Sequence, residues 1–282
     1  MNLLKIVFVL LSFTVQAAAQ VVYLPSDSLI FEKCMQAMDI NKNLPLQDLV
    51  VQTALYFEGT PYVASTLEQT PEQLVVNLRE FDCTTFVESI LALSYTRKDK
   101  NPSFQTYCMN LKRIRYREEI KDYSSRLHYT TDWIQTNEKR GFVKDISQQL
   151  GGAILPVNLY FMSTNADKYK QLLNNPQLTD KIRQQEQAVN ALPHYYVPVS
   201  DIDKRSEMVK SGDMVCFVTT IKGLDVSHVG FALHKDGMLT FIHASLTAKK
   251  VIVNPISIQS YVEGIKHNNG VLFVRPLEQS LK

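Results

Sequence analysis

Near Ser211 the hydrophobic pattern of this chain changes from one period to another. Before that point apolar residues recur at three- and four-residue steps, which is the spacing of amphipathic helices. After it they alternate, as in strands with one buried face, and five segments are predicted as strands: 212–221, 228–234, 238–245, 249–256 and 270–277. Helices followed by a run of strands predict an α+β fold with an antiparallel sheet of about five strands, rather than alternating βαβ units.

The helical half divides into three parts. Residues 25–57 have the pattern of two consecutive helices, and Gly59-Thr60-Pro61 ends the second one. Residues 79–93, REFDCTTFVESILAL, contain an apolar helical face. Residues from about 98 to 200 are predicted to be a mainly helical insertion whose charges face solvent.

Cys83 stands at the start of the helix predicted from residues 79–93. Asp82 precedes it and is a good N-cap, because its carboxylate can accept hydrogen bonds from the free amides of the first turn. Those amides and the helix dipole favour negative charge, so they can lower a thiol pKa and can also bind an oxyanion. A cysteine on an apolar helix is more commonly a small core residue, so this motif alone does not establish a nucleophile.

Two histidines in the strand region supply the base that a cysteine nucleophile requires. Asp236-Gly237 predicts a two-residue hairpin turn, which makes His228 and His243 diagonal neighbours on one face of the sheet. A single histidine is usually structural, but a capped cysteine helix followed by two histidines on one hairpin is a rarer pattern. The register that follows pairs Lys235 with Met238, Gly230 with His243, and His228 with Ser245.

These three side chains suggest a division of roles. Cys83 would attack a carbonyl carbon, and His228 would take the thiol proton and later protonate the leaving amine. His243 would orient the His228 ring and select its tautomer.

Charge and cysteine usage exclude several other classes of protein. The formal net charge is only +2, whereas a nucleic-acid-binding protein is expected to carry a basic patch. No His/Cys cluster has zinc-site spacing and no glycine-rich loop is present, so neither a metal nor a cofactor is expected. Cys216 is predicted to be buried in a strand, while the sequence leaves open whether Cys34 and Cys108 form a disulfide.

The first residues have the pattern of a secretory signal peptide. Lys5 precedes a short apolar run, and Ala17-Ala18-Ala19 supplies the small residues of a cleavage site before Gln20. We therefore expect residues 1–19 to be removed and residues 20–282 to form a single exported domain, periplasmic or secreted. No later stretch is long enough to span a membrane, and a monomer is expected.

Four segments together resemble the NlpC-type papain-like cysteine peptidases of bacterial cell walls: FDCTTFVE, SGDMVCFV, SHVGFAL and FIHAS. Thr84 and Thr85 stand where the common pattern has Ser-Gly. Together with GTPY at 59–62 and SRLHYTTDW at 125–133, they make the chain most similar to the N-acetylmuramoyl-L-alanine amidase-like branch.

The resemblance implies a papain-like fold, with the N-terminal helices packed on the sheet. It also implies hydrolysis of the amide between N-acetylmuramic acid and L-alanine in muropeptides, with Cys83, His228 and His243 as the catalytic residues. Tyr62 would lie on the substrate or oxyanion side. Further candidates for binding substrate or oxyanion are Asp82, Ser125, Arg126, His128, Tyr129, Trp133 and Ser227.

Other interpretations stay open at this point. Arg126 could hold a carboxylate and Trp133 could stack on a sugar, but a structural helix with one buried tryptophan fits the same residues. The activity could instead be that of an endopeptidase that cuts between D-glutamate and a diamino acid. A non-catalytic muropeptide-binding protein with the same fold is a third reading.

Overall fold

The computed structural model describes residues 21–38 and 43–279. The predicted signal peptide, residues 1–19, lies outside these ranges. Within them, no helix is long and apolar enough to cross a membrane.

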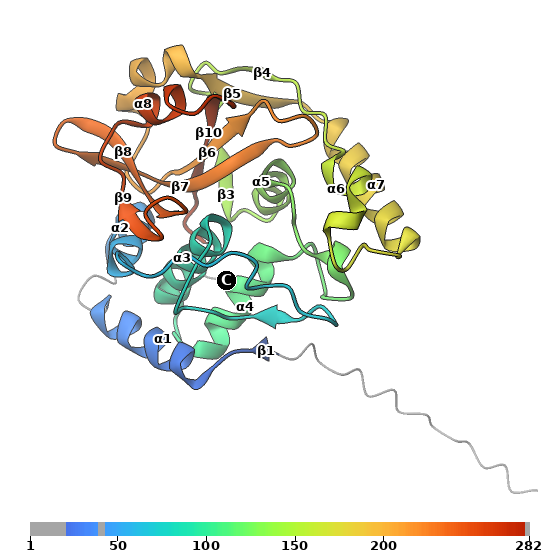
Figure 1. The fold of residues 1–282 in the computed structure, drawn as a ribbon. Coiled ribbons are helices and arrows are strands. Elements are labelled where there is room, and N and C mark those ends of the chain that lie inside the picture. The colour runs from blue at the N-terminus through green and yellow to red at the C-terminus, as the bar shows by residue number, and fades with distance from the viewer. Residues whose placement is uncertain (1–20, 39–42, 280–282) are drawn as a thin grey trace, which may run out of the picture.

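The helices that the periodicity predicts are present (Figure 1), whereas a short helix at 258–263 lies in the half of the chain for which only strands were predicted. Both pieces within 25–57 are helical, and the segment with Cys83 forms one long helix. In chain order the helices are α1 (Pro25–Ala37), α2 (Leu46–Tyr56), α3 (Cys83–Lys98), α4 (Phe104–Arg115), α5 (Thr130–Lys139), α6 (Phe161–Thr164), α7 (Pro176–Asn190) and α8 (Ile258–Glu263).

All five predicted strands are present and belong to one antiparallel sheet. They are β6 (Met214–Thr219), β7 (Val226–Lys235), β8 (Met238–Ser245), β9 (Lys250–Val253) and β10 (Asn268–Pro276). The prediction of about five strands was too low, because the sheet has eight. The other three strands come from the region predicted as a helical insertion: β3 (Val143–Asp145), β4 (Ala153–Leu155) and β5 (His194–Pro198).

The order of strands along the sheet is β4-β5-β10-β6-β7-β8-β9, and β3 also pairs with β10. Two of the additional strands have only three residues each, which is too short to show a period of two. The third ends in proline, which weakens a strand prediction. A separate parallel pair joins β1 (Val21–Val22) to β2 (Leu74–Val75).

The β7–β8 hairpin has the predicted register, with Lys235 opposite Met238. Asp236 and Gly237 both have positive φ, 52° and 75°, as a two-residue turn of this kind requires. The ladder ends at the pair of Phe231 and Ile242, so the two expected pairs beyond it, Gly230 with His243 and His228 with Ser245, are not formed. Past this point β7 stays paired with β6 and β8 stays paired with β9.

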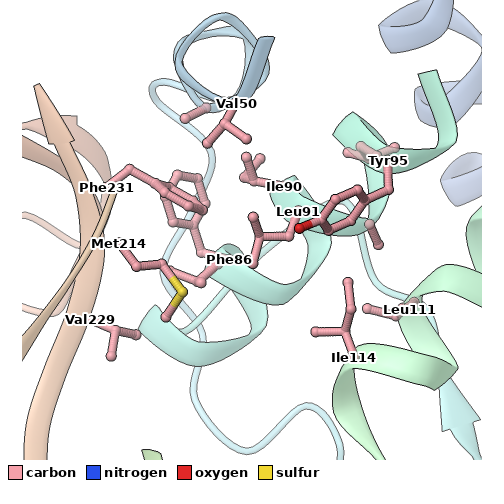
Figure 2. Packing of buried hydrophobic residues seen from close by; sticks show 14 of the residues in the cluster. Val50, Phe86, Ile90, Leu91, Tyr95, Leu111, Ile114, Met214, Val229 and Phe231 are labelled. Atoms are coloured by element: carbon pink, nitrogen blue, oxygen red, sulfur yellow. The ribbon is translucent and has the colours of Figure 1, made fainter. Parts of the chain in front are cut away.

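Helix α3 is the centre of the largest hydrophobic core. It contacts α1, α2 and α4 as well as strands β7 and β8 of the sheet. Figure 2 shows Phe86 of α3 beside Phe231 of β7, with Leu111 and Ile114 of α4 on another side of the helix. Burial of this helix on several sides fixes the position of its first residue, Cys83, against the sheet.

A second core lies on the other face of the sheet. Phe217, Phe241 and Phe273 project from three strands and pack with Ile258 and Val262 of α8. The sheet is therefore covered on both faces, and the histidines of β7 and β8 lie among the aromatic side chains of this second face.

Candidate active site

Cys83 is the first residue of α3, as predicted. The Asp82 carboxylate accepts hydrogen bonds from the Thr85 amide at 2.7 Å and from the Thr85 hydroxyl at 2.8 Å. This cap begins the helix at one defined residue and leaves Cys83 half-buried in the first turn.

His228 on β7 and His243 on β8 are hydrogen-bonded to each other. The Nε2 atom of His228 lies 2.6 Å from the Nδ1 atom of His243, and the two rings are nearly perpendicular at 84°. His243 is only 2% exposed, whereas His228 is half-buried. The predicted proximity of the two histidines is confirmed, even though the ladder between their strands ends before reaching them.

Cys83 and His228 share the wall of one cavity of about 210 Å³. No hydrogen bond joins the Cys83 sulfur to the His228 ring in the part of the chain that the structure describes. Aromatic and apolar side chains from other segments form the far wall: Tyr123, Tyr129, Met162, Tyr169 and Leu224.

A second cavity, of about 500 Å³, lies on the other side of His228. Ser227 and His228 line both cavities, so they stand between the two. The second cavity is further lined by His243, Ser245, Leu246, Thr247, Ala248, Ile252, Asn254, Tyr261 and Ile265. A substrate lying across Cys83 and His228 could therefore place one part in each cavity.

Burial makes both histidines weak bases. It lowers the pKa of His228 to about 4. The pKa of His243 falls to about 3, first because of burial and then because of the charge that His228 would carry. Both rings are therefore neutral at pH 7, and each carries one ring proton.

The thiol pKa of Cys83 does not behave as the helix position predicted. Burial, and then the neighbouring Asp82 carboxylate, raise it to about 11. Hydrogen bonds from the Val229 backbone and from Thr84 lower it, but they do not compensate. The expectation of a depressed thiol pKa is wrong for this resting state, in which Cys83 carries its proton and His228 is neutral.

Ser227 and His128 line the same cavity as Cys83 and His228, and Tyr62 lies in the segment before Cys83. Tyr62 pairs with Phe81, two residues before Cys83, through an isolated β-bridge. Burial, followed by the charges of Cys83 and Asp82, raises the pKa of Tyr62 to about 12. The Ser227 hydroxyl donates to Asn268 Oδ1 at 2.8 Å and to the Phe217 carbonyl at 3.3 Å.

His128 lines the cavity of Cys83. Burial lowers its pKa to about 3, so the ring is neutral, and its Nε2–H donates to the Tyr123 carbonyl at 2.8 Å. This bond holds the ring beside Tyr123, another residue of the same cavity wall.

Three other candidates occupy structural positions. Arg126 is buried in ion pairs with Glu68 at 2.9 Å and Glu72 at 2.8 Å, so its guanidinium is not placed to take a substrate carboxylate. Trp133 is 4% exposed in the main core, and the cavity that it lines, of about 30 Å³, is too small for a sugar ring. The Ser125 hydroxyl accepts the Lys121 amide at 3.1 Å within a turn.

Several residues of the site were not identified from the sequence. Tyr123, Met162, Tyr169 and Leu224 come from separate segments of the central region, and no local pattern links them. Asn254 and Tyr261 follow the predicted hairpin and lie beside His243. Within the described ranges, no group of three or more His, Cys, Asp or Glu side chains is arranged to hold a metal ion.

Comparison with known proteins gives the family. The model of the N-acetylmuramoyl-L-alanine amidase-like family, AmiA-like, matches residues 52–271, and the chain belongs to this family. No curated protein matches the chain.

Solved structures with the same fold include one of an amidase. The structure of an N-acetylmuramoyl-L-alanine amidase from Bacteroides uniformis is 33% identical, with a TM-score of 0.79 over 83% of this chain and 99% of that one. A Bacteroides fragilis protein with a suggested xylanase activity is 34% identical, with a TM-score of 0.76 over 79% and 98%. A Legionella pneumophila protein of the DUF1460 family shares the fold at 21% identity, with a TM-score of 0.66 over 90% and 95%.

Proposed function

We propose that this protein is a cysteine amidase that hydrolyses the bond between N-acetylmuramic acid and L-alanine in peptidoglycan fragments. The observation that carries the proposal is the cavity lined both by Cys83, at the capped start of α3, and by His228, itself hydrogen-bonded to His243. The family and the amidase from Bacteroides uniformis support the choice of substrate.

The first part of the reaction forms a tetrahedral intermediate on the Cys83 sulfur. The Cys83 thiol gives its proton to Nδ1 of His228, because Nε2 of that ring is already bonded to His243. The sulfur then attacks the lactyl carbonyl carbon, and the carbonyl oxygen becomes an oxyanion. Free amides at the start of α3, with the Tyr62 hydroxyl nearby, are suited to bind this oxyanion.

The second half releases the two products. The oxyanion collapses, the C–N bond breaks, and the proton on His228 Nδ1 passes to the amine of L-alanine, which leaves the lactyl group bound to Cys83 as a thioester. A water molecule then gives a proton to the same nitrogen and attacks the thioester carbonyl. The muramic acid carboxyl is released, and the proton returns to the Cys83 sulfur.

We propose that the protein acts outside the cytoplasm, where wall fragments occur. The signal peptide predicted at residues 1–19 would deliver the chain there. Burial of Arg126 and Trp133 shifts substrate recognition to the two cavities on either side of His228.

Mass spectrometry of the products tests the assignment. Incubation of N-acetylmuramoyl-L-alanyl-D-glutamyl peptides with the protein should release a peptide with a free N-terminal L-alanine, and the Cys83→Ala variant should release none. A cut between D-glutamate and the next residue would show an endopeptidase instead. Binding without any cut would show a non-catalytic muropeptide-binding protein.

A further inference from the structure

We propose that Asn254 is a positioning residue that selects the tautomers of His228 and His243 by accepting a hydrogen bond from Nε2–H of His243. This inference rests on the proposed function. It assigns a part in the reaction to a residue just beyond β9 whose own sequence context, VNPI, carries no catalytic signal.

The register of the sheet places Asn254 next to His243. His243 lies opposite Ile252 of β9. The backbone N–H of Asn254 continues the pairing by donating to the Phe241 carbonyl at 2.8 Å. Residues two apart on a strand point to the same face, so Asn254 and His243 are diagonal neighbours on one face. Both side chains line the second cavity.

Hydrogen bonding determines which end of the Asn254 amide is free. Its Nδ2 atom donates to the Ile256 carbonyl at 2.9 Å. Because a carbonyl oxygen can only accept, the nitrogen of the amide must face Ile256, and Oδ1 remains as an acceptor. Asn254 is 6% exposed, so little water competes for this oxygen.

The facing atom of His243 requires such an acceptor. Its Nε2 is buried and has no hydrogen-bond partner within bonding distance in the described part of the chain. The Asn254 side chain favours the protonated form of the His243 ring, as an acceptor would. A buried N–H group left without a partner is costly, so the acceptor stabilises the tautomer that carries its proton on Nε2.

The tautomer of His243 determines whether His228 can act as a base. If His243 carries its proton on Nε2, its Nδ1 must accept from Nε2–H of His228. The Nδ1 atom of His228 is then unprotonated and can take the Cys83 proton. The opposite arrangement, with Nδ1–H on both rings, would present a proton to the sulfur and prevent the transfer.

The test combines nitrogen NMR with kinetics. In wild-type protein labelled with ¹⁵N-histidine, the shifts of His243 should be those of the Nε2–H tautomer. Asn254→Asp keeps an acceptor oxygen and should keep that tautomer. Asn254→Leu and Asn254→Ala, which remove the acceptor, should shift both rings toward Nδ1–H and lower kcat on an N-acetylmuramoyl-L-alanyl peptide about 10- to 100-fold, with little change in KM.

Thr240→Val is the matched control. The Thr240 hydroxyl donates to the carbonyls of Asn254 and Ile256 at 2.7 and 2.8 Å, so its loss loosens the same turn without removing the acceptor. This variant should lose stability but keep the wild-type tautomer and most of kcat. An equal loss of kcat in Thr240→Val and Asn254→Leu would show that only the turn matters.

Two results would overturn the inference while leaving the proposed function intact: an Nδ1–H tautomer on wild-type His243, or full kcat in folded Asn254→Leu. If the proposed function fails instead, no peptide is released by any variant. The NMR measurement still reports the tautomer in that case, so the two failures are distinguishable.

Discussion

Asp82 acts on Cys83 in two opposite ways. Its carboxylate begins α3 by accepting from Thr85, and the same negative charge raises the pKa of the adjacent thiol. The cap therefore fixes the position of the sulfur while opposing its ionisation, so the resting site is better described as a thiol beside a neutral imidazole than as an ion pair.

Asp82→Asn separates these two effects, because asparagine is an equally good N-cap without the charge. We expect the Cys83 pKa to fall by about one pH unit and iodoacetamide labelling at pH 8 to become correspondingly faster. The double variant Asp82→Asn, Cys83→Ala should show no fast labelling, since the other three cysteines are buried. Slower labelling of Asp82→Asn would mean that its charge does not act on the sulfur.

The neutral His228 ring predicts an unusual pH profile. In the proposed mechanism, activity requires an unprotonated His228, whose pKa burial lowers to about 4, and a Cys83 thiol, whose pKa is raised to about 11. As pH falls below about 4 the ring gains its proton and activity is lost. We expect kcat/KM to be flat from about pH 5 to pH 9. A bell-shaped profile with a limb near pH 8 would instead indicate a resting thiolate–imidazolium pair.

At the scale of elements, one buried ion pair joins α3 to its neighbours. Arg115 of α4 donates to Glu88 of α3 at 2.6 Å and to the Val75 carbonyl of β2 at 2.7 Å, and both charged side chains are 2% exposed. The pair lies along the same helix that begins at Cys83, so it helps to hold α3, α4 and β2 in one arrangement.

Removing one partner of this pair should be more damaging than removing both. Glu88→Leu or Arg115→Met alone leaves a buried charge unpaired, and we expect a loss of about 3–5 kcal/mol in the free energy of unfolding. The double variant should lose less than either single variant, and therefore clearly less than the sum of the two losses. Urea denaturation of the wild type, the two single variants and the double variant measures the coupling between Glu88 and Arg115. Strict additivity of the two single losses would contradict the coupling.

The elements that sequence periodicity predicted are those with long, regular patterns. Helix α3 and the β7–β8 hairpin were predicted because Asp82 and Asp236-Gly237 are local signals with a defined geometry. Strands β3, β4 and β5 were not predicted, because short strands are stabilised by their neighbours in the sheet rather than by their own residues.

The same distinction applies to the candidate site: features with a local sequence signal were predicted, and features that depend on distant segments were not. The proximity of His228 and His243 was predicted from one hairpin signal, and the position of Cys83 at a helix start was predicted from one N-cap. For Arg126 the sequence left a substrate ligand and a structural residue both open, because Glu68 and Glu72, which neutralise it, lie in a distant segment. The thiol pKa could not be predicted either, since it depends on how deeply the whole fold buries the sulfur.

At the scale of the whole molecule, the packing of α3 on the sheet brings the cysteine and the histidines together. Phe86 is fully buried at this contact, with its ring centroid 6.1 Å from that of Phe231. Residues of the N-terminal helices and of the C-terminal strands thus meet only because one core is shared between them.

Phe86→Ala should therefore weaken the whole fold. A cavity at this position is expected to lower the free energy of unfolding by about 3–5 kcal/mol. Thermal unfolding followed by circular dichroism measures the loss, and Phe104→Ala, on the half-buried start of α4, is a control that should cost less. A Phe86→Ala variant as stable as wild type would show that α3 does not depend on this contact.

The most direct test of the account is the activity of a protein without the Cys83 sulfur. Cys83→Ala and the matched control Cys108→Ala, which alters a buried cysteine on α4, would be assayed on an N-acetylmuramoyl-L-alanyl peptide after both are shown to be folded. We predict no detectable hydrolysis by Cys83→Ala and near-wild-type hydrolysis by Cys108→Ala. Hydrolysis by folded Cys83→Ala at a rate near that of the wild type would contradict the account.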